Sequence, residues 1–200
     1  PRWRIGRWLV GVTALLLLLT TVVFVDETEF VLVERFGKIV AVYDQSSQSG
    51  LHFKGPWPIE TVRRFDRRLQ LLSPAGREAF TRDRKNVTVE AYVAWRISEG
   101  STETKLLDRP AVRFFRSFGS IDVAEARLAS RLQSVLTEQV GRAELTELLI
   151  AADSEAAPKD GNGPLEKLSN DIRDELSRRT DESDTLRDRV GIEIVDVRIR

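Results

Sequence analysis

Few of the residue types that carry out covalent or metal chemistry occur in this sequence. Its 200 residues include no cysteine and one histidine, His52. Without cysteine there can be no disulfide, thiol catalysis or thiolate metal site, and one histidine cannot supply a histidine-rich metal centre or a catalytic triad. Carboxylates are numerous, but none form a pair at a spacing that indicates a shared pocket, and no phosphate-binding glycine loop or hydrolase motif is present. We therefore expect no enzyme activity, catalytic residue, metal site or cofactor.

One apolar segment, from Leu51 to Ile59, is a candidate for contact with a membrane surface. Its glycine and two prolines exclude a helix, and aromatic side chains favour the interface between membrane and water. The alternative is that Leu51 and Phe53 fill a small β core. We interpret the histidine of this segment as a packed or hydrogen-bonded residue and not as a pH switch. The candidate contact residues are Leu51, His52, Phe53, Trp57 and Ile59.

A second candidate contact is a set of four arginines that follows this segment: Arg63, Arg64, Arg67 and Arg68. Guanidinium groups can bind lipid phosphates at a membrane surface. They can equally pair with acidic residues of a neighbouring subunit. Asp66 lies among them and argues against a site for anionic lipid alone, so we favour pairing between subunits.

The N-terminal 29 residues have the charge and hydropathy pattern of a membrane anchor. Three arginines precede an uncharged run from Trp8 to Val25, and acidic residues follow at once. As a helix, about 18 residues span about 27 Å, close to the hydrocarbon thickness of a bilayer. The positive-inside bias keeps the basic flank in the cytoplasm and places the remainder across the membrane. The expected anchor residues are Trp8, Leu15, Leu16, Leu17, Leu18, Leu19, Phe24 and Val25.

The alternative for this run is a cleavable signal peptide. Its apolar part would span about 7–15 residues and would end in a small-x-small cleavage site. Here the run ends in Thr-Thr-Val-Val-Phe-Val, without such a site, so we favour an uncleaved signal anchor. Because the sequence contains no methionine, we expect the gene product to begin upstream of Pro1.

The rest of the chain has the composition of a globular protein, with 42% hydrophobic and 31% charged residues and a net charge of zero. A neutral chain has no long-range field that would favour nucleic acid. Strand patterns dominate the first half. They cover 30–36 and 39–43, joined by a tight turn, then 61–72, and an alternating run over 87–97 that we expect to pair with 78–82.

Helical patterns dominate the second half. Apolar residues recur at helical spacing over 121–140, and Asp122 with Glu125 predicts a capping box. We interpret the apolar face as core; the alternative is a groove for a partner. A short helix over 144–150, a loop over 151–163, a helix from Pro164 and a closing strand over 191–199 complete the pattern. The fold class is therefore α+β.

The ordered set of motifs resembles the SPFH (stomatin/prohibitin/flotillin) domain. Phe30–Lys38, Gly50–Lys54, Phe65–Arg68 and Thr81–Asn86 correspond to successive parts of that domain. Val89–Ser98 resembles the HflC-type branch in particular. The closing segment 191–199 completes a resemblance that covers residues 22–200.

The resemblance implies a single N-terminal membrane segment, a β-rich subdomain at the membrane, an α/β subdomain and then a coiled coil. On this basis we assign 1–28 to the basic flank and transmembrane anchor, 29–98 to the β-rich subdomain and 99–200 to the α/β subdomain. The coiled coil of the family would begin at about Arg200, so we expect the chain to be truncated there.

The resemblance also implies a function by assembly. Proteins of the HflC-type branch pair with HflK-type subunits in rings or cages that surround an FtsH-type membrane AAA protease and restrict its access to membrane substrates. The implied partners are membrane lipids, an HflK-like subunit and an FtsH-type protease, with no nucleic acid. The implied location is the bacterial inner membrane, with a cytoplasmic N-terminus and a periplasmic domain. The alternatives are a stomatin-like microdomain scaffold for another membrane protein and a monomeric, membrane-tethered regulatory domain.

Overall fold

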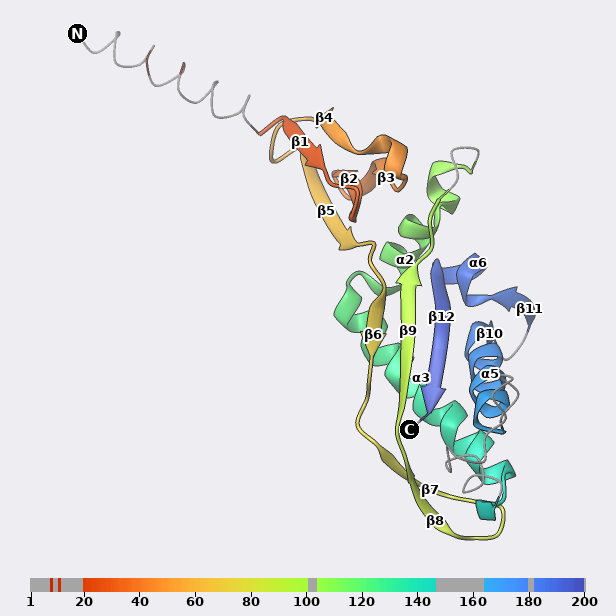
Figure 1. The fold of residues 1–200 in the computed structure, drawn as a ribbon. Coiled ribbons are helices and arrows are strands. Elements are labelled where there is room, and N and C mark those ends of the chain that lie inside the picture. Colours follow the sequence, from red (N-terminus) through yellow and green to blue (C-terminus); the bar gives the residue numbers. More distant parts are fainter. Residues whose placement is uncertain are drawn as a thin grey trace. The chain divides into compact units, whose positions relative to one another are not determined.

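The computed structural model describes Trp8, Gly11 and residues 20–100, 104–146, 164–179 and 182–199. The chain forms two compact units (Figure 1). The first contains the chain up to Arg68 together with Glu99–Arg113, and the second contains Leu69–Ser98 and Phe114–Arg200. The contacts thus group residues 69–98 with the second unit, whereas the sequence placed them in the β-rich subdomain.

The first unit is built on a three-stranded antiparallel sheet of order β3-β2-β5. Its strands are β2 (Glu29–Arg35), β3 (Lys38–Tyr43) and β5 (Glu60–Asp66). The predicted hairpin over 30–43 is confirmed, because β2 and β3 pair directly. Four consecutive residues of the central strand, Phe30–Val33, are buried, which is the pattern of a strand covered on both faces.

A two-stranded ribbon packs on this sheet. It consists of β1 (Val22–Val25) and β4 (Gly50–Phe53), and the inner side chains Val23 and Val25 form a buried cluster with Val31. The expectation that the anchor helix continues to Val25 is therefore wrong at its end. β-branched and aromatic residues favour a strand that is buried on one face, and Val22–Val25 alternates between exposed and buried.

Most of the expected anchor lies outside the described residues, including Leu15–Leu19. Among the helices that the structure describes, none has the length and apolar character needed to cross a membrane.

A buried ion pair holds the segment that returns to the first unit. Arg109 Nη1 lies 2.9 Å from Asp44 Oδ1 and also donates to the Val42 carbonyl oxygen at 3.1 Å. The two side chains are 10% and 0% exposed. A Cβ on Gly100 would collide with the Asp44 carboxylate, and Gln45 Nε2 donates to the Gly100 carbonyl oxygen at 3.1 Å. Asp44 and Gln45 therefore fix both parts of the returning chain.

The second unit contains the antiparallel sheet β12-β9-β6 (Figure 1). Its strands are β6 (Gln70–Leu72), β9 (Ala91–Ile97) and β12 (Ile192–Ile199). The predicted closing strand is thus confirmed. The single strand predicted over 61–72 is wrong, because β5 and β6 belong to different sheets.

The strand predicted over 87–97 is divided as well. It forms β8 (Asn86–Val89) and β9, with a break at Glu90. The first part pairs with β7 (Arg77–Phe80) in a separate ribbon, as expected for the hairpin at this position.

Helices occur in both units. The first unit contains the short helices η1 (Ser46–Gln48) and η2 (Leu106–Asp108). The residues of α2 (Pro110–Phe118) are divided between the two units. The second unit contains α3 (Ile121–Arg142) and α5 (Pro164–Ser177). The sequence did not predict β10 (Arg178–Arg179), β11 (Glu182–Thr185) or α6 (Leu186–Val190).

The long helix α3 has its predicted apolar face in the core, which confirms the core interpretation over the partner groove. Ala124, Leu128, Leu132 and Val140 are all buried. Its N-cap is Ser120 and not Asp122: the Ser120 side chain accepts a hydrogen bond from the Val123 backbone N–H. The helix over 144–150 and the loop over 151–163 lie mostly outside the described residues. Strands and helices together confirm the α+β class.

Candidate membrane-contact site

One face of the β1–β4 ribbon is apolar and exposed. The antiparallel register pairs Val22 with Phe53 and Phe24 with Leu51, and directly paired residues project to the same face of a sheet. These side chains are 42%, 75%, 62% and 60% exposed, respectively. We call Val22, Phe24, Leu51 and Phe53 the apolar ribbon face. The exposure rules out the alternative in which Leu51 and Phe53 fill the core.

The energetic consequence of this face is a strong tendency to make contacts. Fully burying one valine, leucine or phenylalanine side chain stabilises by about 1.5–3 kcal/mol. A cluster of several such side chains on one surface is typical of a site that meets another protein or a membrane.

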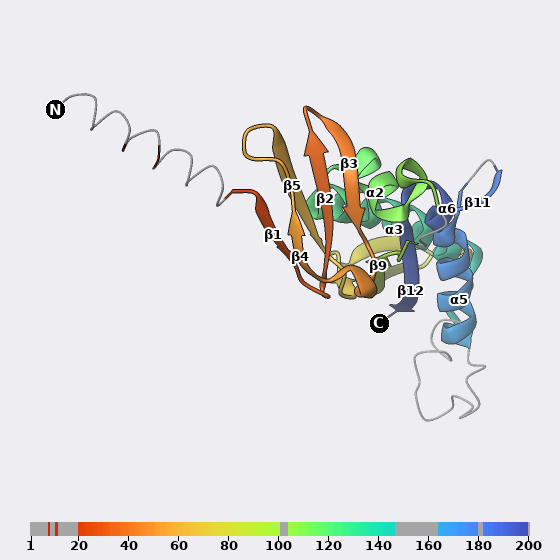
Figure 2. The ribbon, with the colours of Figure 1, turned by 90° about the horizontal axis from the view of Figure 1, so that it is seen from above.

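The loop between β4 and β5 continues the apolar surface. Trp57 is 63% exposed and Ile59 is 41% exposed. The Trp57–Pro58 peptide bond is cis, and the loop closes through a hydrogen bond from the Ile59 N–H to the Pro56 carbonyl oxygen at 2.9 Å. Figure 2 shows this loop at the same end of the first unit as the β2–β3 turn.

The same loop lies beside the two residues that precede β1. The Trp57 backbone N–H donates to Thr20 Oγ1 at 3.3 Å, and the Lys54 backbone N–H donates to the Thr21 carbonyl oxygen at 2.8 Å. The apolar ribbon face and Trp57 therefore belong to the part of the unit that the N-terminal run enters.

His52 occupies a packed position in β4. Its Nε2 donates to the Gln48 carbonyl oxygen at 2.7 Å, and its ring centroid lies 4.0 Å from that of Tyr43. This arrangement agrees with the expectation of a packed, hydrogen-bonded histidine.

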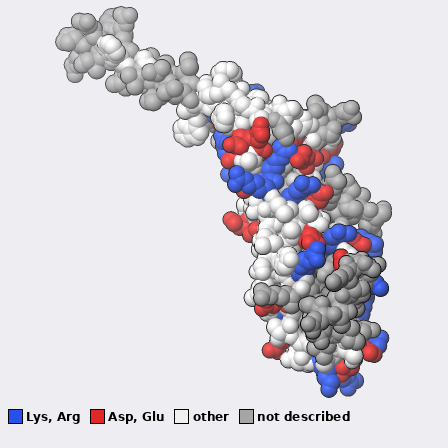
Figure 3. All heavy atoms as spheres, viewed as in Figure 1, with Lys and Arg blue, Asp and Glu red and all other residues white. Residues whose placement is uncertain are grey.

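The arginines of the second candidate contact are engaged within the chain. Arg63 pairs with Glu34 at 3.3 Å and Arg64 pairs with Glu29 at 2.6 Å. Arg67 pairs with Glu99 at 2.6 Å, and its guanidinium lies 5.6 Å from the centroid of the Phe30 ring. Arg68 lies at the end of the same segment, where its backbone N–H donates to Asp66. Basic and acidic side chains are accordingly intermixed over the first unit (Figure 3). Contact of the arginines with lipid or with a neighbouring subunit remains a prediction.

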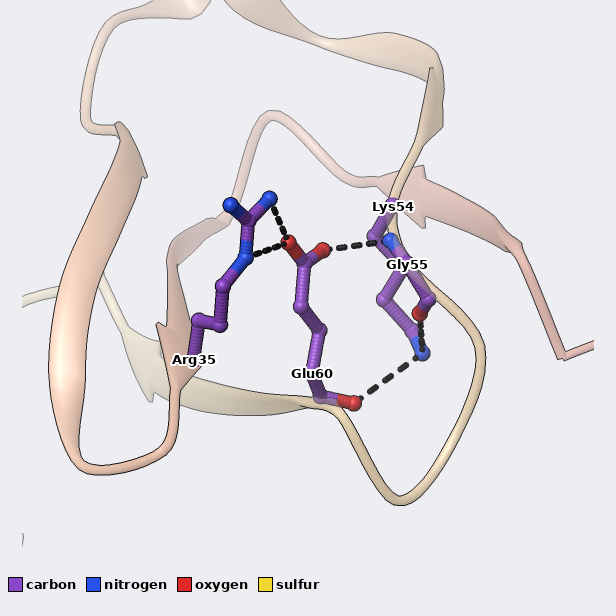
Figure 4. Close-up of polar contacts among 4 residues, drawn as sticks. All are labelled: Arg35, Lys54, Gly55 and Glu60. Atoms are coloured by element: carbon purple, nitrogen blue, oxygen red, sulfur yellow. Dashed lines mark hydrogen bonds and ion pairs between the residues drawn. The ribbon is translucent and has the colours of Figure 1, made fainter.

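A buried carboxylate, Glu60, organises the β4–β5 loop (Figure 4). Its Oε1 accepts from Arg35 Nε at 2.8 Å and from Nη2 at 2.5 Å, and its Oε2 accepts from the Gly55 N–H at 2.5 Å. Lys54 Nζ donates to the carbonyl oxygens of Gly55 and Glu60, at 3.1 and 3.3 Å. The Gly55 N–H and then the Arg35 guanidinium lower the pKa of Glu60, because both favour the charged form.

Sequence reasoning found part of this site. It identified Leu51–Ile59 but assigned Phe24 to the anchor and did not single out Val22 or Glu60. The available signal was the run Val-Val-Phe-Val before an acidic residue, since β-branched residues favour strands. Nothing local in the sequence indicated that the Glu60 side chain is buried.

The class of protein follows from the comparison with protein families. Residues 23–200 match the SPFH domain / Band 7 family, and the chain belongs to that family.

The similar curated proteins are of the HflC type. The chain is 28% identical to "Modulator of FtsH protease HflC" of Escherichia coli (strain K12), over 94% of the chain and 60% of that protein. It is 27% identical to "Protein HflC" of Buchnera aphidicola subsp. Acyrthosiphon pisum (strain APS), over 92% of the chain and 56% of that protein. It is 26% identical to "Protein HflC" of Vibrio parahaemolyticus serotype O3:K6 (strain RIMD 2210633), over 94% and 59%. The chain thus spans less than two thirds of the length of these relatives.

Proposed function

We propose that this protein is a membrane-anchored scaffold subunit that acts in the manner of HflC. It assembles with HflK-like subunits into a ring or cage and regulates the access of substrates to an FtsH-type membrane AAA protease. The observation that carries this proposal is the similarity to HflC proteins along 92–94% of the chain. The name of the Escherichia coli relative describes a modulator of FtsH protease.

The proposed mechanism is geometric. The N-terminal run anchors each subunit in the bacterial inner membrane, with the basic flank in the cytoplasm and the two units in the periplasm. The apolar ribbon face and the β4–β5 loop rest on the lipid surface, so that the unit is held against the bilayer at more than one point. Neighbouring subunits then form a wall that limits which membrane proteins reach the protease.

The exposed residues support this membrane contact. Phe24, Leu51, Phe53 and Trp57 are each at least 60% exposed. Thr20, which lies in the N-terminal run just before β1, is hydrogen-bonded to the loop that carries Trp57. This hydrogen bond supports a position of these side chains close to the bilayer that, in the proposal, holds the N-terminal run.

The test is purification of the complex from native membranes. The full-length gene product carries an affinity tag, is extracted with a mild detergent, and its companions are identified by mass spectrometry. We expect an HflK-like subunit and an FtsH-type protease in the eluate, and neither in the same purification from untagged cells. Failure to recover either partner, from membranes in which both are detected, would overturn the assignment.

A further inference from the structure

The turn between β2 and β3 carries an aromatic residue in an unfavourable backbone conformation. Phe36 has φ 48° and Gly37 has φ 78°. A two-residue hairpin turn with positive φ at both positions favours asparagine, aspartate or glycine at its first position, and a bulky residue there is strained. The Phe36 side chain is also 80% exposed. Neither turn geometry nor core packing accounts for a phenylalanine at this position.

One buried group ties this turn to the loop that carries Trp57. Arg35, the residue before Phe36, donates two hydrogen bonds to one oxygen of Glu60, and the Gly55 N–H donates to the other oxygen. The backbones of Arg35 and Glu60 are also directly opposite in the β2–β5 register. In Figure 4 the turn after Arg35 and the loop between Gly55 and Glu60 extend in the same direction from this pair. Glu60 therefore sets the positions of both tips.

The charges around the two tips are arranged with cations outside and carboxylates inside. The Arg35 side chain is 56% exposed, whereas that of Glu60 is 4% exposed. Lys38, which follows the turn, is exposed as well. The Glu34 side chain is 12% exposed and its partner Arg63 is 59% exposed. A rim of exposed cations around apolar tips complements the phosphate groups of a lipid surface.

We propose that Phe36 and Trp57 form a paired apolar tip that enters the acyl region of a phospholipid bilayer, and that Glu60 is the positioning residue that aligns the two. This inference rests on the membrane contact proposed above. It adds a second insertion point on a separate hairpin and names the group that couples the two insertion points. The occupant is lipid, because the tips continue the apolar surface beside the N-terminal run and carry a cationic rim.

The experiment is fluorescence quenching by lipids brominated on their acyl chains. The whole chain is reconstituted in vesicles of phosphatidylethanolamine and phosphatidylglycerol, with Trp3→Phe and Trp8→Phe to remove the indoles of the N-terminal run. Trp95 remains as a constant background, since it is fully buried in the second unit. One protein keeps Trp57; a second carries Phe36→Trp with Trp57→Phe. The matched control carries Phe80→Trp with Trp57→Phe, because Phe80 is 68% exposed on a strand of the second unit.

We expect brominated lipid to quench the indoles at positions 57 and 36 but not at position 80. Glu60→Gln keeps the size of the side chain and removes its charge. Because charge-assisted hydrogen bonds are stronger than neutral ones, the variant holds the two tips less firmly, and we expect quenching at both positions to fall. If Glu60→Gln fails to fold by circular dichroism, Arg35→Lys replaces it, since lysine cannot reproduce the forked contact. It should also reduce the quenching.

The outcomes separate the two proposals. Quenching at position 57 without quenching at position 36 would overturn the paired tip and leave the membrane contact standing. Absence of quenching at both positions would overturn both. Protection of position 36 from aqueous acrylamide without quenching by brominated lipid would mean that Phe36 meets protein, which also overturns the inference. Unchanged quenching in folded Glu60→Gln or Arg35→Lys would remove the positioning role.

Discussion

Asp44 and Arg109 form the most deeply buried ion pair among the described residues, at 0% and 10% side-chain exposure. Removing one partner of such a pair leaves the other charge buried and uncompensated, which destabilises the fold. Burial raises the pKa of Asp44, and the Arg109 charge opposes that change. The pair is therefore a fixed structural contact that holds Glu99–Arg113 to the first unit.

Replacing this aspartate should destabilise the protein strongly. Asp44→Asn leaves the Arg109 guanidinium buried without a counter-charge, and breaking a buried pair in this way costs about 3–5 kcal/mol. Chemical denaturation followed by circular dichroism measures the change. Asp108→Asn, at an exposed position of η2, is the matched control and should change the stability by less than about 0.5 kcal/mol. Equal effects of the two substitutions would contradict the structural role of the pair.

Glu60 predicts a dependence of stability on pH with a definite sign. Its pKa in the folded protein lies below the ordinary value of 4.5, so the unfolded chain takes up the proton first as the pH falls. The stabilisation from this group is present above pH 4.5 and is lost as the pH drops through the folded-state pKa. Glu60→Gln should therefore be less stable than the parent at neutral pH, and the difference should shrink in acid. Thermal melts across this range, with Glu27→Gln as an exposed control, measure it; a difference that grows in acid would refute the assignment.

At the scale of elements, the ribbon of β1 and β4 has two faces with different roles. Val23 and Val25 hold it to the sheet, while the apolar ribbon face is exposed. A change on the exposed face should alter membrane contact and leave the fold intact.

The double substitution Phe24→Thr and Phe53→Thr tests this division. Threonine suits a strand and removes both aromatic side chains from the exposed face. In the full chain with Trp3→Phe and Trp8→Phe, reconstituted in vesicles, we expect the Trp57 emission to shift to longer wavelength, because the loop no longer rests on lipid. The melting temperature should stay close to that of the parent. Phe80→Thr is the control on the second unit, and an unchanged Trp57 spectrum in the double variant would contradict the proposed contact.

The elements that sequence could predict are those set by local patterns. The apolar period of α3, the proline that begins α5 and the alternation of β9 each depend on neighbouring residues. Strand pairing does not. β6 and β9 belong to the second unit because β9 pairs with β12, about a hundred residues later in the chain, and no pattern within 69–98 encodes that partner. The candidate site shows the same limit of sequence-based prediction. The apolar segment that contains Leu51 and Trp57 can be identified from local sequence, whereas the buried position of Glu60 involves its contact with Arg35 on another strand.

At the scale of the whole molecule, the chain belongs to the SPFH domain / Band 7 family and is similar to HflC proteins. In the proposed function, many copies of the protein surround a membrane patch. Under this proposal, the residue-scale contacts and the apolar ribbon face keep each subunit in a fixed orientation on the bilayer.

The mass of the particle extracted from native membranes tests this claim most directly. The full-length gene product, released in a mild detergent and kept at low ionic strength, is analysed by light scattering after size-exclusion chromatography. The proposed cage predicts particles in the megadalton range that contain this protein and an HflK-like subunit. A monomer or dimer under conditions that keep the membrane protease intact would contradict the scaffold function.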